Sequence, residues 1–244
     1  MSAETFDGIV ETVPSRLTQI GTILADETRS NILTVLMDDR ARTGGELARY
    51  AGVAPSTASE HLSKLLDAGL VTIEAQGRHR YFRIADRDVA EMLESLGAAV
   101  PADPVRPNAP SALIYARSCY DHLAGELAVQ IYDQLLMDRH LEQVDGYPQL
   151  TESGSTLLEG LGIDVNALRA GKRPLVRSCL DWTERRHHLA GAAGAALLQT
   201  FLERRWVTRG PQPRSIRLTR KGKAALDEHL GTRTQVAATR HAHG

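Results

Sequence analysis

The feature that most constrains the fold of this chain is an internal repeat in its second half. Three short blocks of sequence recur there in the same order, at offsets of 60, 66 and 68 residues. The blocks are RSCYD at 117–121 and RSCLD at 177–181, HLAG at 122–125 and at 188–191, and LTESG at 150–154 and LTRKG at 218–222. Such a repeat predicts a pseudo-symmetric domain in which equivalent blocks meet across a shared interface.

We expect each copy of the repeat to fold as a helix, a short β-hairpin and a following helix. Apolar residues at steps of four predict the first helix of each copy. They are Leu123, Leu127, Ile131 and Leu135 in the first copy and Leu189, Ala193, Leu197 and Phe201 in the second. We expect the repeated domain, for effector binding or dimerisation, to cover residues 113–230, followed by a disordered tail at 231–244.

A proline-rich segment precedes the repeat. Pro101, Pro104 and Pro107 lie within seven residues, and this spacing prevents a helix from continuing. We therefore predict a linker at 101–112 between a first domain at 1–100 and the repeated domain.

The first domain has the pattern of a winged helix-turn-helix. Helices are expected at 15–24, 27–37 and 44–50, with Asp26 and Thr43 as caps of the second and third. Pro55 suits the first turn of a helix that ends near residue 67, and strands are expected at 70–73 and 81–84, before a helix at about 86–96. The predicted class is mainly α with small β-hairpins (α+β).

The helix that begins at Pro55 has the residues expected of a DNA-reading helix. Its outward positions carry short or polar side chains, which allow close approach to base edges and phosphates in the major groove. These positions are Ser56, Thr57, Ser59, Glu60, Ser63 and Lys64. The hairpin tip QGRHR at 76–80 is a basic wing that reaches phosphates or the neighbouring minor groove.

Four motifs together resemble the ArsR-type winged-helix repressors over roughly residues 15–96. They are ELA at 46–48, STASEHLSKL at 56–65, AGLV at 68–71 and GRHRYF at 77–82. The resemblance implies a homodimer that binds double-stranded DNA at a palindromic operator and is released by an effector. On matching positions it implies DNA contacts by Ser56, Thr57, Ser59, His61, Lys64, Arg78 and Arg80.

Two points in this region stay open. His61 either contacts DNA or packs against the wing. The alternative to DNA binding for the whole domain is an adaptor role, in which the winged helix contacts another protein.

One departure from the family moves the expected effector site. Metal-sensing members carry paired cysteines in the helix before the recognition helix, but this stretch reads GELARYA at 45–51 and has no thiol. We therefore expect the effector to bind in the C-terminal half.

The repeated blocks supply candidate ligands for that effector. On one helix, Cys119 and His122 would share a face and hold one metal ion, while Asp121 would point away. Cys179 and His188 are their counterparts in the second copy. If a pseudo-twofold axis relates the copies, the two cysteines approach each other and form a metal or metalloid site, or a reversible disulfide in a redox sensor.

Structural packing is an equally serious explanation for these blocks. A buried cysteine behaves as a small apolar residue, and ion pairs within RSCxD, Arg117 with Asp121 and Arg177 with Asp181, would explain part of the motif. A hydrophobic small-molecule pocket between the copies, with Trp182 and Trp206 as walls, is compatible with each alternative.

Charge is distributed unevenly along the chain. The net charge of −1 conceals −9 over residues 84–170 and +10 over 171–244. The basic stretch at 204–223 has the layout of a second wing, and it either extends the DNA footprint or pairs with the acidic segment in the same chain or across a dimer.

Other function classes find little support in the sequence. It has no phosphate-binding glycine loop, metalloprotease helix or nucleophile elbow, so we expect no enzyme, and a thiol-dependent activity is the form an enzyme would take. No cofactor is required, although a metal ion or redox-active thiols are candidates. Two cysteines, no signal peptide and no membrane span predict a cytoplasmic protein without a membrane partner.

Overall fold

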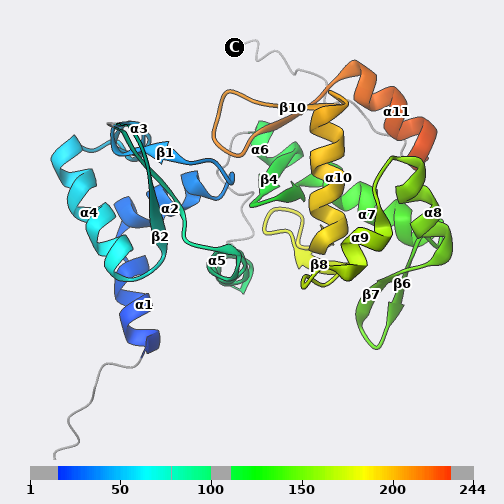
Figure 1. Ribbon diagram of the computed structural model, residues 1–244, viewed down its shortest axis with the longest axis horizontal. Coiled ribbons are helices and arrows are strands. Elements are labelled where there is room, and N and C mark those ends of the chain that lie inside the picture. The colour runs from blue at the N-terminus through cyan, green and yellow to red at the C-terminus, as the bar shows by residue number, and fades with distance from the viewer. Residues whose placement is uncertain (1–15, 78, 100–110, 232–244) are drawn as a thin grey trace, which may run out of the picture. The chain divides into compact units, whose positions relative to one another are not determined.

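The computed structural model describes residues 16–77, 79–99 and 111–231 (Figure 1). These residues form two compact units, which we describe separately. The first unit comprises Met1–Thr34 and Ala41–Ala85, and the second comprises Val35–Arg40 and Asp86–Gly244. The helix after the wing, which the sequence analysis grouped with the first domain, therefore belongs to the second unit. Most of the predicted linker, nearly all of the predicted tail, and Arg78 lie outside the described residues.

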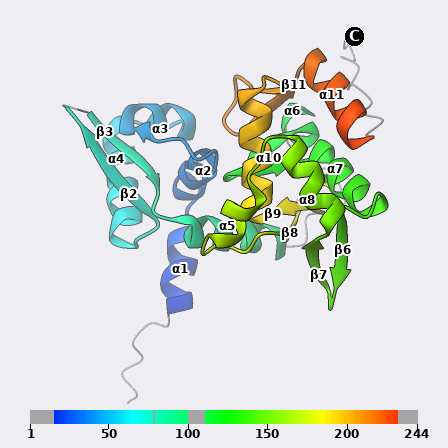
Figure 2. The same cartoon turned by 45° about the vertical axis from the view of Figure 1, so that its right-hand side comes forward.

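The first unit is a winged helix-turn-helix, as predicted. Figure 2 shows its β2 and β3 as a long ribbon. Its elements are α1 (Arg16–Leu24), α2 (Glu27–Leu36, whose last two residues belong to the second unit), β1 (Arg42–Thr43), α3 (Gly44–Ala51), α4 (Pro55–Asp67), β2 (Val71–Gln76) and β3 (His79–Ile84). The three strands form one antiparallel sheet in the order β1-β3-β2. Strand β1 was not predicted, because a two-residue strand has too few residues to show an alternating pattern.

Local sequence signals place the helices of the first unit. Thr43 and Glu46 form a reciprocal capping box at the start of α3, and Pro55 occupies the first turn of α4. Gly69 adopts a φ of 69°, which ends α4 and turns the chain into β2. The inner faces of α3 and α4 supply buried leucines, so the opposite face of α4 is left to solvent.

The second unit contains the repeat. Its elements are α5 (Arg87–Ala99), α6 (Ser111–Tyr115), β4 (Arg117–Cys119), β5 (His122–Ala124), α7 (Glu126–Met137), β6 (Leu141–Val144), β7 (Tyr147–Leu150), α8 (Glu152–Gly160), α9 (Val165–Ala170), β8 (Arg177–Leu180), β9 (His187–Ala190), α10 (Gly191–Glu203), β10 (Val207–Arg209), β11 (Ile216–Leu218) and α11 (Arg220–Leu230). In the described part of the chain, no helix is long and apolar enough to cross a membrane.

Each copy of the repeat is a hairpin, a helix, a second hairpin and a second helix. The copies are β4-β5-α7-β6-β7-α8 and β8-β9-α10-β10-β11-α11. The predicted helix, hairpin and following helix are present in each copy. The prediction that RSCxD and the first leucine of each apolar helical face lie on a helix was wrong. Leu123 and Leu189 lie in strands. Gly125 precedes α7 and Gly191 is the first residue of α10, and both turn the chain from strand to helix with φ near 90°.

The two copies pack against each other with their helices exchanged. The helix α7 of the first copy packs on β9 of the second, and α10 of the second packs on β5 of the first. This confirms the expectation that equivalent blocks meet across a shared interface. The exchange puts hairpins from both copies side by side in the apolar core of the unit.

The recurrence of the LTxxG block has a physical reason. The Thr151 hydroxyl accepts a hydrogen bond from the Gly154 amide at the start of α8, and Thr219 does the same for Gly222 at the start of α11. A side chain at Gly154 would overlap the carbonyl oxygen of His140, and one at Gly222 would overlap that of Trp206. Both helices thus begin in contact with the backbone of the preceding hairpin, which only glycine permits.

Ion pairs join the acidic and basic segments of the chain. Four arginines of the basic segment 171–244 pair with carboxylates of the acidic segment 84–170, and one of them, Arg214, lies in the stretch 204–223. This supports pairing with the acidic segment in the same chain as the explanation of the uneven charge. The pairs are Arg173–Asp121, Arg177–Glu91, Arg186–Asp133 and Arg214–Glu94.

Candidate nucleic-acid interface and effector site

The helix α4 presents a polar face to solvent. Ser56, Ser59 and Lys64 are exposed and Thr57 is half-buried, whereas the apolar residues between them are buried. Ser56, Ser59 and Lys64, which are predicted DNA contacts, therefore lie on the side of α4 that is open to a ligand, and Thr57 lies at its edge. Hydroxyl groups and one lysine on such a face suit the major groove of DNA.

His61 lies one turn after Thr57 on α4 and approaches the start of α2. Its Nδ1 is 3.4 Å from Oδ1 of Asp26, and its side chain is only 14% exposed. The same carboxylate caps α2 by accepting a hydrogen bond from the Arg29 amide. His61 thus packs against the start of α2, a partner that was not predicted.

The wing is a regular hairpin with a basic tip. The strands pair from Val71 with Ile84 to Gln76 with His79, and Gly77 turns the chain with a φ of 60°. Arg80 is exposed next to the tip, where it can reach a phosphate. Arg78 is outside the described residues.

Two equivalent hairpins supply the candidate effector ligands. Cys119 pairs directly with His122 across the first hairpin, and Cys179 pairs with His188 across the second. The expectation of one helix face was therefore wrong in its geometry. A cross-strand pair places two side chains about 5 Å apart on one face of a hairpin, so the same two residues still converge.

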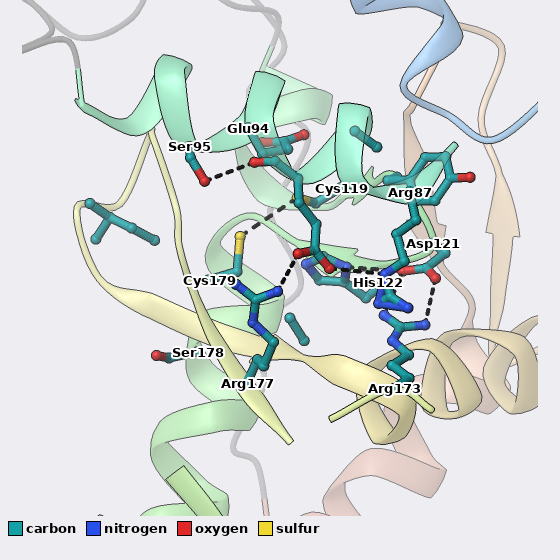
Figure 3. A pocket seen from close by; sticks show the side chains of 15 residues that line it. Arg87, Glu94, Ser95, Cys119, Asp121, His122, Arg173, Arg177, Ser178 and Cys179 are labelled. Atoms are coloured by element: carbon teal, nitrogen blue, oxygen red, sulfur yellow. Dashed lines mark hydrogen bonds and ion pairs between the residues drawn. The ribbon is translucent and has the colours of Figure 1, made fainter. Parts of the chain in front are cut away.

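The structure brings all four of these side chains together. One ligand atom from each of Cys119, His122, Cys179 and His188 lies within 4.8 Å of every other, and Sγ of Cys119 is 3.8 Å from Sγ of Cys179. Figure 3 shows the two cysteine side chains pointing toward one another. The two imidazole rings stack with centroids 5.1 Å apart. Three of the four residues are buried and Cys179 is half-buried.

Each histidine has a carboxylate beside its Nδ1. Oδ1 of Asp121 is 3.3 Å from Nδ1 of His122, and Oδ2 of Asp181 is 3.6 Å from Nδ1 of His188. Nε2 of His122 and both ring nitrogens of His188 are buried and make no hydrogen bond. Unpaired buried nitrogens are costly, and these belong to residues of the Cys/His cluster.

The electrostatics of the cluster separate the two thiols. Burial raises the pKa of Cys119 well above its usual value. The hydrogen bond with Cys119, together with the two nearby imidazoles, lowers the pKa of Cys179. Burial acts to lower the pKa of His122, but the Asp121 carboxylate and the Cys179 sulfur outweigh it and raise that pKa.

One prediction placed an arginine–aspartate ion pair within each RSCxD block. These pairs do not form. Arg117 instead forms a bidentate pair with Asp181 of the other copy, with both contacts at 2.8 Å. Asp121 pairs with Arg173, and hydrogen bonds from His122 and Arg173 overcome the effect of burial and lower the pKa of Asp121 to about 2. In strands, residues four apart do not face each other as they do in a helix, so the pairs form between the copies.

A cavity of about 330 Å³ opens beside the cluster within the second unit. Both cysteines and His122 line it, as do Glu91 and Glu94 of α5. Figure 3 shows Glu94 on this helix beside the two cysteines. The predicted walls were wrong, because neither tryptophan lines the cavity. Trp206 is buried against Phe201 and His229, and Trp182 stacks on the Arg117 guanidinium. The role of α5 as a wall was not predicted, because nothing in the local sequence pattern of this helix indicates what it packs against.

Residues next to the cluster contact the segment 35–40, which interrupts the first unit in sequence. The chain enters the second unit at Val35 and leaves it after Arg40. The Tyr120 amide, in the turn between Cys119 and His122, donates a hydrogen bond of 3.0 Å to the Met37 carbonyl. Arg209 donates one of 3.2 Å to the carbonyl of Asp38.

Comparisons with known proteins agree with the winged helix. A model of the bacterial regulatory proteins of the arsR family matches residues 26–72. An uncharacterized HTH-type transcriptional regulator of Bacillus subtilis (strain 168), YdfF, is 43% identical over 221 residues, which cover 89% of this chain and 98% of that protein. The HTH-type transcriptional regulator CmtR of Mycobacterium bovis is 39% identical over 88 residues, or 36% of this chain and 74% of CmtR.

Solved structures resemble the chain only in part. A homodimeric winged helix-turn-helix DNA-binding domain from Mycobacterium bovis is 28% identical, covers 39% of this chain and 86% of its own, and has a TM-score of 0.32. The similarity to YdfF, in contrast, extends across both units.

Proposed function

The chain belongs to the ArsR family of bacterial regulatory proteins, and from this premise we propose that it is a homodimeric repressor controlled by an effector. It is a DNA-binding winged helix-turn-helix transcriptional regulator, and its relatives carry the names of regulators, not of enzymes. The finer parts of the proposal concern the operator, the dimer and the place where the effector binds.

The proposed operator is a palindrome read by two copies of α4. A twofold dimer places its recognition helices in successive major grooves, so the half-sites lie about 10 bp apart from centre to centre. The exposed polar face of α4 supports base contact, and Arg80 on the wing supports phosphate contact.

We place the effector at the cluster of Cys119, His122, Cys179 and His188. The observation that carries this is the hydrogen bond between Tyr120 and Met37, because it ties the turn of the first ligand hairpin to the segment 35–40. That segment follows most of α2 and precedes α3, so its position bears on the helices that support α4. The helix α5, which follows the wing in sequence, lines the cavity next to the cluster.

Regulation then needs only a two-state equilibrium. An effector that binds the low-affinity state about 100-fold more tightly than the DNA-binding state supplies about 2.7 kcal/mol of coupling. This is enough to release the regulator from most operator sites when its concentration is only moderately above the Kd for the operator.

The test begins with DNA selected from a random pool by the full chain. We expect an inverted repeat, two chains per duplex, and an affinity that falls steeply with salt. Zn²⁺ and a thiol oxidant are then titrated separately into the complex in fluorescence anisotropy, and at least one should release the DNA. Release that persists in the Cys119→Ser/Cys179→Ser variant argues against the cluster, and failure to bind any duplex favours the adaptor role.

A further inference from the structure

We propose that Cys119, His122, Cys179 and His188 form a tetrahedral site for one divalent, thiolate-binding metal ion of the zinc class. This deepens the proposed function, on which the regulatory meaning of the site rests. Metal binding itself is independent of DNA, so the two can fail separately.

The donor set and its spacing fit a zinc-class ion. Two sulfurs and two imidazole nitrogens are the ligands of a closed tetrahedral zinc site. With Zn–S bonds of about 2.3 Å, two thiolates in a tetrahedron lie about 3.8 Å apart. The two Sγ atoms are 3.8 Å apart, and all four ligand atoms already lie within 4.8 Å of one another.

The surroundings of the histidines fit the same site. A histidine that binds metal usually has a carboxylate beside its other ring nitrogen, which orients the ring. Asp121 lies beside Nδ1 of His122, and Asp181 lies beside Nδ1 of His188. This leaves Nε2 of each ring, buried and without a hydrogen bond, for the metal.

Charge balance selects a divalent ion. Arg173 pairs with Asp121 and Arg117 pairs with Asp181, so the charges of both carboxylates are already compensated. When the ion binds, the two thiols lose their protons to solvent, and two thiolates neutralise two positive charges. A monovalent ion would leave a buried net charge of −1 and a trivalent one +1, and either is expensive away from water.

The rival for this cluster is a disulfide between Cys119 and Cys179. It would shorten the sulfur–sulfur distance from 3.8 Å to about 2.05 Å. It would also leave the unpaired nitrogens of both imidazoles as they are, whereas a metal ion uses one from each. The geometry therefore favours the metal, and the cavity of about 330 Å³ beside both cysteines provides the ion with a route from solvent.

The decisive experiment uses the full unmodified chain, reduced and freed of metal by a chelator. Co²⁺ is titrated in, and we expect one ion per chain, the strong visible absorption of tetrahedral cobalt and a thiolate-to-cobalt charge-transfer band. Zn²⁺ should displace it at one equivalent. X-ray absorption of the Zn²⁺ form should show two sulfur and two nitrogen neighbours.

Two neighbouring histidines make a matched pair of variants. His188 and His187 are adjacent in β9, but His188 is buried in the cluster and His187 is exposed. We expect His188→Ala to weaken Zn²⁺ binding at least 100-fold in competition with a chromophoric chelator, and His187→Ala to change it less than threefold. Circular dichroism of both variants reports whether they remain folded. If His188→Ala does not fold, the cobalt and zinc measurements on the unmodified chain still test the proposed site.

The results separate this proposal from the regulatory one. An octahedral cobalt spectrum, a spectrum without thiolate ligands, or equal affinity in both histidine variants overturns the metal site. A reduced chain that binds no metal but releases DNA on forming a disulfide also overturns it, while keeping the proposed function. Metal binding with the expected spectrum and no effect on DNA affinity keeps the site and rejects its regulatory role.

Discussion

Arg117 of the first copy and Asp181 of the second form a fully buried, bidentate ion pair across the repeat. The arginine is 2% exposed and the aspartate is inaccessible to solvent. The same carboxylate accepts hydrogen bonds from the Gly125 amide and from Thr183, and it lies beside His188. One interaction thus joins the two copies and supports one ligand of the Cys/His cluster.

Removing this arginine should destabilise the chain strongly. Arg117→Ala leaves a buried carboxylate without its partner, and we expect the free energy of unfolding to fall by about 3–5 kcal/mol in urea denaturation. Arg186→Ala is the matched control, because Arg186 is 60% exposed in its pair with Asp133 and its loss should cost less than about 1 kcal/mol. Equal losses would show that the buried pair contributes no more than a surface pair.

The first turn of α8 lies so close to the backbone of the preceding hairpin that a side chain at Gly154 should destabilise the chain. Gly154→Ala would push a methyl group into the His140 carbonyl, and we expect a loss of about 1–3 kcal/mol by thermal unfolding. Gly160→Ala, at the other end of α8, meets nothing within 4 Å and should be neutral or stabilising. A neutral Gly154→Ala would mean that α8 shifts away from the hairpin at no cost.

The wing should contribute to DNA affinity through phosphate contact. Arg80→Ala should weaken binding to specific and unrelated duplexes alike, and lower the slope of log affinity against log salt by about 1. Lys172→Ala removes the same charge from the second unit and should leave the slope unchanged. If the two variants have the same slope, Arg80 makes no phosphate contact.

Contact with the segment 35–40 should transmit the effector signal. Arg209→Ala removes the hydrogen bond to the Asp38 carbonyl, and we expect it to reduce the ratio of DNA affinities without and with effector at least threefold. Arg217→Ala, on the facing strand β11, loses the same charge and should keep the ratio. Anisotropy titrations of both variants, with and without whichever of Zn²⁺ and the thiol oxidant releases DNA from the unmodified chain, measure this ratio.

Metal affinity should also depend on the carboxylates behind the histidines. Asp121→Asn removes the negative charge beside Nδ1 of His122, and we expect Zn²⁺ binding to weaken about 10–100-fold. Asp133→Asn breaks a surface pair outside the cluster and should have no effect on chelator competition. An unchanged affinity in Asp121→Asn would mean that this carboxylate only pairs with Arg173.

Much of the first unit was predictable from sequence because its signals are local. The Thr43 cap, Pro55 and Gly69 each act within a few residues, so they mark where α3 begins and where α4 begins and ends. The partner of His61 was not predictable, since Asp26 is 35 residues away and reaches it only through the packing of α2 against α4.

The second unit shows the limit of spacing arguments. Leucines at steps of four suggested one helix through Leu123, but Gly125 interrupts it with a φ of 90°. A strand then replaces the expected helix, and every partner inferred from helical spacing changes with it. Cys119 and His122 nevertheless converge, because cross-strand pairing replaces the helix face.

The winged helix, the repeated second half and the correspondence of Cys119, His122, Cys179 and His188 between the copies can be recognised without coordinates. The packing of each helix on the other copy's hairpin, the ion pair of Arg117 with Asp181 and the meeting of the four ligands could be seen only once the chain was folded. The difference lies in the separation of the residues along the chain. Local propensities act over a few residues, whereas contacts between residues about 60 apart depend on how two apolar faces pack together.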